Sequence, residues 1–392
     1  MTAASAAANE NELQLPAFVV KDLFPDGAPD TLLDSNKPTL ASLAAQRLPI
    51  VVPWHAKQTI YPGQFFHSRL YTASDPWSKS SAFSTAQDEE EQLPPDRSRI
   101  VYLSADGGTS GSFKSTKTQS TTAKEGHESY GFTATVDLGF CSASASLKYD
   151  SHLSTNNDDI KTSVRASYRC GTILLRHPPP LSEEAKLELK YGGGIEAFEQ
   201  KYGDYFVFGY NLGGDNSMMV STNSKSMSLA ERKTLTVKVE SFFFDIEFTQ
   251  HYDSAEASAS ASLRVTGYDT LTASNLDDQQ SWAASSSAEF DRMQRETARM
   301  RNLGATLPTR VEEKAAQLGL ALGPSWLAAE RTNESLAKRN RTPYAPPASL
   351  EKAVDRETCD RLIKSCLVVE IVLMPVRSLR QVQYWITEDD VI

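Results

Sequence analysis

The sequence has 392 residues, 40% of them hydrophobic, so it exceeds one average domain but suits one large domain with a substantial core. It carries 40 basic and 50 acidic residues, and the resulting net charge of −10 argues against nucleic-acid binding, which normally needs a basic excess or stripe. No apolar run approaches the roughly 20 residues of a membrane-spanning helix. The amino terminus lacks the basic and apolar regions of a secretory signal. We therefore expect a protein that is soluble when made, and either cytoplasmic or released by an unconventional route.

Recognisable catalytic and cofactor motifs are missing from the sequence. It contains no GxxxxGK[ST], HExxH or GxSxG motif, and its six histidines have no metal-ligand spacing. Gly192-x-Gly194-x-x-Ala197 matches a dinucleotide fingerprint, but that fingerprint needs a buried apolar strand before it, and the preceding segment is charged and helical. We interpret these glycines as a hinge between two helices. We expect no cofactor and no metal, and the sequence leans away from an enzyme.

The first part of the chain, residues 1–97, is punctuated by prolines with aromatic residues between them, which predicts an irregular N-terminal layer. A second region, 98–302, is mainly strand-like as far as about Asp269 and is predicted to turn helical from about Ser285. Its segments 99–104 and 164–175 have the composition of strands. Between them, 105–131 is rich in Ser, Thr, Gly and Lys, and we expect little packing there.

Two short helices with a glycine hinge are predicted within 182–203. Ile195, Phe198 and Tyr202 share one face of the second helix. Gly203 can take positive φ and end that helix. The apolar residues that follow predict a strand buried on both faces, and Gly213-Gly214 lets that strand bend or another backbone approach.

The last region, 303–392, is predicted to begin with helices. Thr309 and Glu312 have the spacing of a capping box, and Pro324 starts another predicted helix. Segments 367–376 and 381–386 have the composition of strands. Strands in the middle with helices around them indicate an α+β fold.

Two regions fit either a helix or a strand. Residues 131–141 alternate apolar and polar side chains, and so do 242–249 and, beyond a short polar loop, 255–265. Eleven alternating residues suit a transmembrane barrel strand, but both regions are also consistent with ordinary antiparallel strands that have one wet face. The apolar residues that would face lipid are Phe132, Val136, Leu138 and Phe140 in the first region and Phe242, Phe244, Ile246 and Phe248 in the second.

The stretch KYGDYFVFGYNLGG, residues 201–214, resembles the signature of the membrane attack complex/perforin (MACPF) family. That signature is an aromatic residue, Gly, Thr or Ser, His and an aromatic residue, commonly followed by a Gly-Gly pair. Tyr202, Gly203 and Phe206 fit it, whereas Asp204 replaces Thr or Ser and Tyr205 replaces His. Further on, the family's strand end and its later tryptophan are matched by Gly267, Asp269 and Trp282. The order and spacing of segments match over about 98–295.

The resemblance implies a bent, twisted, largely antiparallel MACPF-like sheet with flanking helical clusters. It also implies a pore-forming toxin that causes cytolysis: a soluble protein that binds membrane lipid, forms a homo-oligomeric ring and inserts β-hairpins from the two alternating regions. Fungal members such as pleurotolysin B act with a small lipid-binding partner protein. Residues 303–392 lie outside the match, as an extension that completes or flanks the core.

Two other functional classes remain open at the level of sequence. One is a non-lytic MACPF-fold protein that acts as a binding scaffold. The weakly hydrophobic, alanine-rich segment 255–265 and the substitutions Asp204 and Tyr205 favour it. The other is an enzyme with a pocket between the sheet and the N-terminal layer, lined by Trp54, Tyr61, Phe65 and Phe66.

Overall fold

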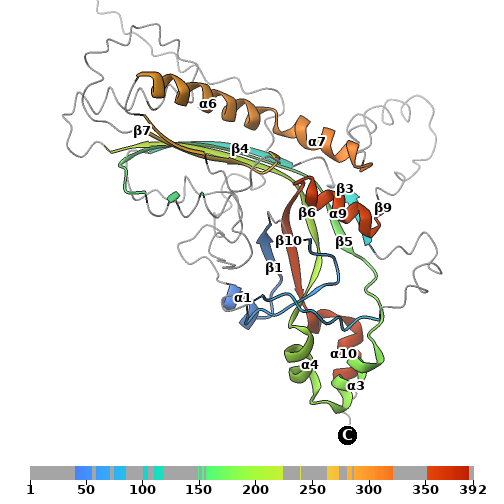
Figure 1. The fold of residues 1–392 in the computed structure, drawn as a ribbon. Helices are drawn as coiled ribbons and strands as arrows, with labels where there is room; N and C mark the ends of the chain where they lie inside the picture. The colour runs from blue at the N-terminus through green and yellow to red at the C-terminus, as the bar shows by residue number, and fades with distance from the viewer. Residues whose placement is uncertain are drawn as a thin grey trace, which may run out of the picture.

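The fold is α+β, as expected (Figure 1). The computed structural model describes residues 40–54, 59–70, 75–84, 100–104, 110–118, 149, 152–153, 156–223, 239, 263–272, 280–284, 287–320 and 351–387. The alternating segments 131–141 and 242–249, most of 255–265, and the predicted helix at Pro324 lie outside the described residues. No helix in the described ranges combines the length and the apolar composition needed to cross a membrane.

Ten described strands form one sheet in which all the pairings are antiparallel. The strands are β1 (Ile50–Pro53), β2 (Phe65–Phe66), β3 (Ile100–Ser104), β4 (Ser110–Thr118), β5 (Ile160–Leu175), β6 (Tyr205–Thr222), β7 (Leu263–Asp269), β8 (Gln280–Ala284), β9 (Glu351–Ala353) and β10 (Val368–Pro375). The main path is β1-β10-β6-β5-β3-β9, with β2 and β7 also on β6, β4 on β5, and β8 on β7.

Strands β5 and β6 run through two differently oriented halves of the sheet, and the sheet turns sharply between them in Figure 1. In what we call the lower half, β6 pairs with β10 through 205–212. In the upper half, it pairs with β7 through 216–221. Because β5 pairs with the other edge of β6 from Gly209 to Thr222, β10 and β7 are successive partners along one edge. The predicted bent, largely antiparallel sheet is therefore present.

The expected helix pair lies at the lower end of the sheet as α3 (Glu183–Tyr191) and α4 (Gly194–Tyr202) (Figure 1). The hydroxyl of Ser182 accepts a hydrogen bond from the N–H of Ala185 and caps α3. Glycines separate the two helices, and the element before them is a helix, as predicted, whereas a dinucleotide fingerprint follows a strand. The buried face of α4 includes the three residues predicted for it, Ile195, Phe198 and Tyr202.

Two helices, α6 (Ser287–Ala305) and α7 (Leu307–Gln317), lie along the upper half of the sheet (Figure 1). The predicted capping box is wrong, because α7 begins at Leu307, before Thr309, and Thr306 at its N-cap makes no side-chain capping bond. Pro308 occupies the first turn, where its missing N–H costs nothing, so the helix starts earlier than the box predicted. Glu312 instead accepts a hydrogen bond from the hydroxyl of Tyr168.

The C-terminal region supplies helix α9 (Arg356–Lys364), strand β10, the short helix η5 (Val376–Ser378) and helix α10 (Arg380–Thr387). Strand β10 confirms the prediction for 367–376 and pairs with both β1 and β6. The strand predicted at 381–386 is wrong, because this segment belongs to α10. Val382 is fully buried and Trp385 and Ile386 pack against the same core, a spacing that also suits one face of a helix.

The Ser/Thr/Gly/Lys segment also differs from its prediction. Residues 110–118 form β4, which pairs with β5 over its full length. A strand needs only a partner for its backbone groups, and polar side chains do not prevent that pairing. Helix α1 (Leu40–Ala45) precedes β1.

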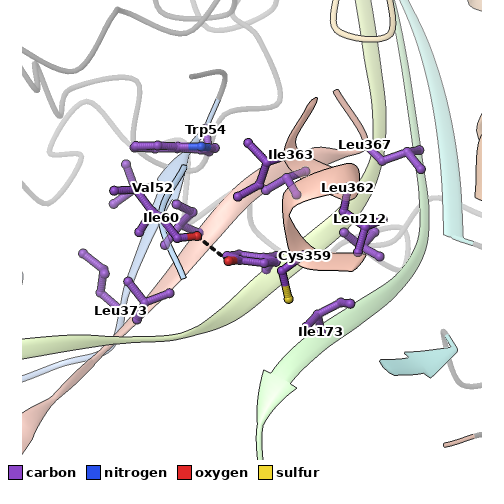
Figure 2. Close-up of a cluster of buried hydrophobic side chains, with 14 of the residues drawn as sticks. Val52, Trp54, Ile60, Ile173, Leu212, Cys359, Leu362, Ile363, Leu367 and Leu373 are labelled. Atoms are coloured by element: carbon purple, nitrogen blue, oxygen red, sulfur yellow. Dashed lines mark hydrogen bonds between the residues drawn. The ribbon is translucent and has the colours of Figure 1, made fainter. Parts of the chain in front are cut away.

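The main hydrophobic core joins the N-terminal layer to the C-terminal region across the lower half. Side chains from β1, β5, β6, β10 and α9 converge there (Figure 2). Those labelled are Val52, Trp54, Ile60, Ile173, Leu212, Cys359, Leu362, Ile363, Leu367 and Leu373. The hydroxyl of Tyr210 donates to the carbonyl oxygen of Ile60 within this core.

Candidate hinge of the central sheet

The signature residues Tyr202, Gly203, Tyr205 and Phe206 lie where α4 passes into β6. Gly203 has φ of 123°, in the region that favours glycine, and its N–H donates to the carbonyl oxygen of Glu199. Tyr202, Tyr205 and Phe206 are buried. The prediction that Gly203 ends the helix with positive φ is confirmed, as is the strand that follows.

The two residues that depart from the signature both bind the N-terminal layer. The carboxylate of Asp204 accepts hydrogen bonds from the backbone N–H of Ser68 at 2.7 Å and from its hydroxyl. The hydroxyl of Tyr205 donates to the carbonyl oxygen of Leu48 at 2.9 Å, and burial raises the pKa of Tyr205 to about 12. These side chains therefore attach Leu48 and Ser68 of the N-terminal layer to the start of β6.

Gly213 and Gly214 lie at the junction of the two halves, where β6 exchanges β10 for β7. A Cβ at Gly213 would lie 2.0 Å from the carbonyl oxygen of Tyr168, so the backbones of β5 and β6 approach too closely there for any other residue. The register of β5 and β6 shifts between Arg169 and Gly171, which leaves Cys170 as an extra residue on β5. The predicted close approach at this glycine pair is therefore present.

A charged cluster that the sequence analysis missed occupies this junction. The guanidinium of Arg169 donates to Asp215 Oδ1 at 2.7 Å and to Asp215 Oδ2 at 3.1 Å. It also donates to Glu370 Oε1 at 2.9 Å. Side-chain exposure is 17% for Arg169, 10% for Asp215 and 8% for Glu370, so solvent screens these charges weakly.

Polar neighbours complete the cluster. Glu370 Oε2 accepts from the Asn211 amide at 2.7 Å, and Asp215 Oδ1 accepts from the Ser167 hydroxyl at 2.7 Å. Burial by itself would lower the pKa of Arg169, but the charges of Asp215 and Glu370 outweigh it and raise that pKa above its ordinary value. The available sequence signals were Glu370 interrupting an apolar strand and Asp215 directly after the glycine pair.

Helix α7 packs against the opposite side of the junction. A Cβ at Gly214 would come within 2.9 Å of Leu307 and 3.1 Å of Val311, both on α7. Asp269 at the end of β7 forms a bidentate ion pair with the Arg310 guanidinium, with N···O distances of 2.6 and 3.0 Å. Sheet movement at this junction would therefore change the contacts of α7.

The other predicted site residues are only partly placed. Gly267 and Asp269 belong to β7, where they pair with Met218 and Asn216 just above the junction. Trp282 belongs to β8, and its side chain lies outside what the structure describes. The eight predicted lipid-facing residues of segments 131–141 and 242–249 also lie outside the described residues.

The aromatic residues suggested as a pocket lining are packed into cores. Trp54 and Phe66 both contact Trp77 in the main core, while Phe65 faces a second core and contacts Phe83. Tyr61 donates to Asp360. Within the described ranges, no group of three or more His, Cys, Asp or Glu is arranged to hold a metal ion.

No family model matches the chain, and no curated protein matches it. Several solved structures resemble parts of it, among them the following three. GNIP1Aa from Chromobacterium piscinae is 12% identical, with 56% of this chain and 44% of that chain covered and a TM-score of 0.20. A protein with a MAC/perforin domain from Bacteroides thetaiotaomicron is 12% identical, with 56% and 51% covered and a TM-score of 0.20. A Gram-negative toxin is 9% identical, with 64% and 56% covered and a TM-score of 0.27.

The matched part of the chain thus spans about half the length of these structures. TM-scores this low describe a partial likeness and carry no inference about function.

Proposed function

We propose that this protein forms pores: it binds a membrane, assembles with copies of itself into a ring, and inserts two β-hairpins. The observation that carries the proposal is the order of strands in the upper half, β4-β5-β6-β7. The two alternating regions lie in the links 119–159 and 223–262, which join β4 to β5 and β6 to β7.

Both links leave the sheet at the same end. Thr118 at the end of β4 pairs with Lys161, next to the first residue of β5. Ile160 in turn pairs with Thr222 at the end of β6, and Ser221 pairs with Arg264 in β7. Four strand ends are therefore aligned side by side. If each link extends as a hairpin, it lengthens two strands that are already neighbours in the correct antiparallel order.

The chemistry of the links suits such an extension. In a bilayer every backbone polar group needs a partner within the protein, which a barrel of continuous strands supplies. The alternation in 131–141 provides one apolar and one polar face. Its eleven residues match the length of a transmembrane barrel strand, which is about 9–11 residues. The junction at Gly213, where β6 changes partners, offers a place at which the upper half can reorient toward the membrane. The protein would reach the membrane by binding a membrane lipid directly or by binding a small lipid-binding partner protein.

A second candidate is a binding scaffold that does not perforate. It is favoured by Asp204 and Tyr205, which depart from the signature and make fixed bonds to the N-terminal layer. In that case the sheet would keep its bend on membranes.

Dye release from lipid vesicles, with and without a small lipid-binding protein, followed by electron microscopy for rings, tests the proposal. The sharper experiment places single cysteines at positions 132 to 140 in a Cys141→Ser chain and labels each with an environment-sensitive dye. The three buried cysteines stay in place, and the dye-treated Cys141→Ser chain serves as the control.

On membranes, dyes at the even positions should report an apolar environment and dyes at the odd positions a wet one. In buffer the series should lack this two-residue period. The same pattern in both conditions would indicate a fixed soluble strand and contradict insertion, and it would favour the scaffold.

A further inference from the structure

The two halves of the sheet meet at three residues of β6. Residues 205–212 pair with β10 and 216–221 pair with β7, so 213–215 belong to neither ladder. Single backbone bonds cross this gap on each side: the N–H of Gly213 donates to Leu367 at 2.8 Å, and the N–H of Thr270 donates to Asp215 at 2.9 Å. Little backbone pairing therefore fixes the angle between the halves along this edge of β6.

Arg169 makes side-chain bonds to both halves across this gap. Asp215 lies on the upper side, where its carbonyl accepts from Thr270, and Glu370 lies on β10 in the lower half. Gly213, which belongs to neither ladder, is the register partner of Arg169. We propose that the cluster of Arg169, Asp215 and Glu370 is an electrostatic latch that holds the sheet bent and must break when the halves reorient.

The charges of the latch identify the bond that crosses the gap. One guanidinium serves two carboxylates, and two of its three bonds to carboxylate oxygens go to Asp215. A neutral side chain at Glu370 would leave Arg169 and Asp215 as a balanced pair on one side of the gap. The substitution removes the charge-assisted bond between Arg169 and residue 370, which joins the two halves. The bond from the Asn211 amide is kept, because a glutamine carbonyl can still accept it. Glu370→Gln is therefore the selective change.

Hydrogen exchange followed by mass spectrometry measures this tie without any membrane. Glu370→Gln should raise amide exchange at 209–216 and 367–372 about tenfold, because opening of the junction then no longer breaks a charge-assisted bond between the halves. Glu196→Gln, a matched change at a carboxylate that is 77% exposed, should leave exchange as in the wild type. Val382→Ala creates a cavity in the second core, the one that contains Phe65 and α10 side chains. It serves as a control for a general loss of stability.

Dye release from vesicles is the second measurement, and this step alone rests on the proposed function. Glu370→Gln should release dye several-fold faster than the wild type, and Val382→Ala should not. If exchange rises at the junction while no variant, the wild type included, releases dye, the latch stands and the pore proposal falls.

The latch is overturned if Glu370→Gln leaves exchange at 209–216 unchanged, or if Val382→Ala raises it equally. It is also overturned if the wild type releases dye and Glu370→Gln does so no faster. Should Glu370→Gln fail to fold, Arg169→Lys replaces it. Lysine keeps the charge but lacks the planar guanidinium that contacts Asp215 and Glu370 together, and amide exchange at 209–216 is judged in the same way.

Discussion

Asp204 accepts two hydrogen bonds from Ser68, one from its backbone N–H and one from its hydroxyl, across 136 positions of sequence. The turn at Ser68 follows β2, so this contact fixes the N-terminal layer where α4 passes into β6. The residue that departs from the family signature therefore has a structural role particular to this chain.

Replacing Asp204 with the threonine usual in the signature should destabilise the protein by about 1–3 kcal/mol, because Ser68 loses a charged acceptor in a largely buried site. Thermal unfolding followed by circular dichroism measures the effect. Glu184→Gln is the control, since Glu184 is 73% exposed and its ion pair with Lys201 lies at the surface. An unchanged melting temperature for Asp204→Thr would show that the contact contributes little.

Gly213→Ala and Gly214→Ala should differ in severity although the residues are adjacent. A methyl group at Gly213 would meet a backbone oxygen at 2.0 Å, and a paired strand cannot move away. At Gly214 the neighbours are side-chain atoms at 2.9 to 3.1 Å, which can shift more easily than a paired backbone. Urea unfolding should give Gly213→Ala the larger loss of stability, at least twice that of Gly214→Ala. Equal losses would argue against the close approach of the two strands.

Stability should fall in mild acid, with His67 contributing. Burial lowers the pKa of His67, and the charge of Asp204 offsets part of that effect. The unfolded state, with an ordinary histidine pKa near 6.5, therefore binds the proton first as pH falls through that value. His67→Gln should make the melting temperature less dependent on pH between about 7.5 and 5.5. The exposed His177→Gln is the control, and a pH dependence that survives in His67→Gln would exclude this origin.

A chain truncated after Asn302 should not fold. It lacks β10, which pairs with β6 on one side and β1 on the other, and it lacks the buried side chains of α9. The main core would lose Cys359, Leu362, Leu367, Ile371 and Leu373 together. Circular dichroism should show no cooperative melting. A cooperative transition would mean that residues 303–392 form a dispensable extension.

The sequence by itself determined the elements whose periodicity and composition leave one solution. Strands β5, β6 and β10, the helix pair with its glycine hinge, and the positive φ of Gly203 all followed from local patterns. It failed where a local pattern fits two structures. Residues 381–386 alternate like a strand, yet Val382, Trp385 and Ile386 also share a helical face, and packing selects the helix.

Only the tertiary structure decided how distant charges combine. Arg169, Asp215 and Glu370 come from three strands, and the contact between Arg169 and Glu370 joins residues 201 positions apart. No local pattern marks such a cluster, because its members become neighbours only when β10 and β5 take opposite edges of β6. The bend has the same origin: the glycine pair permits it, but the exchange of β10 for β7 along one edge of β6 sets its place.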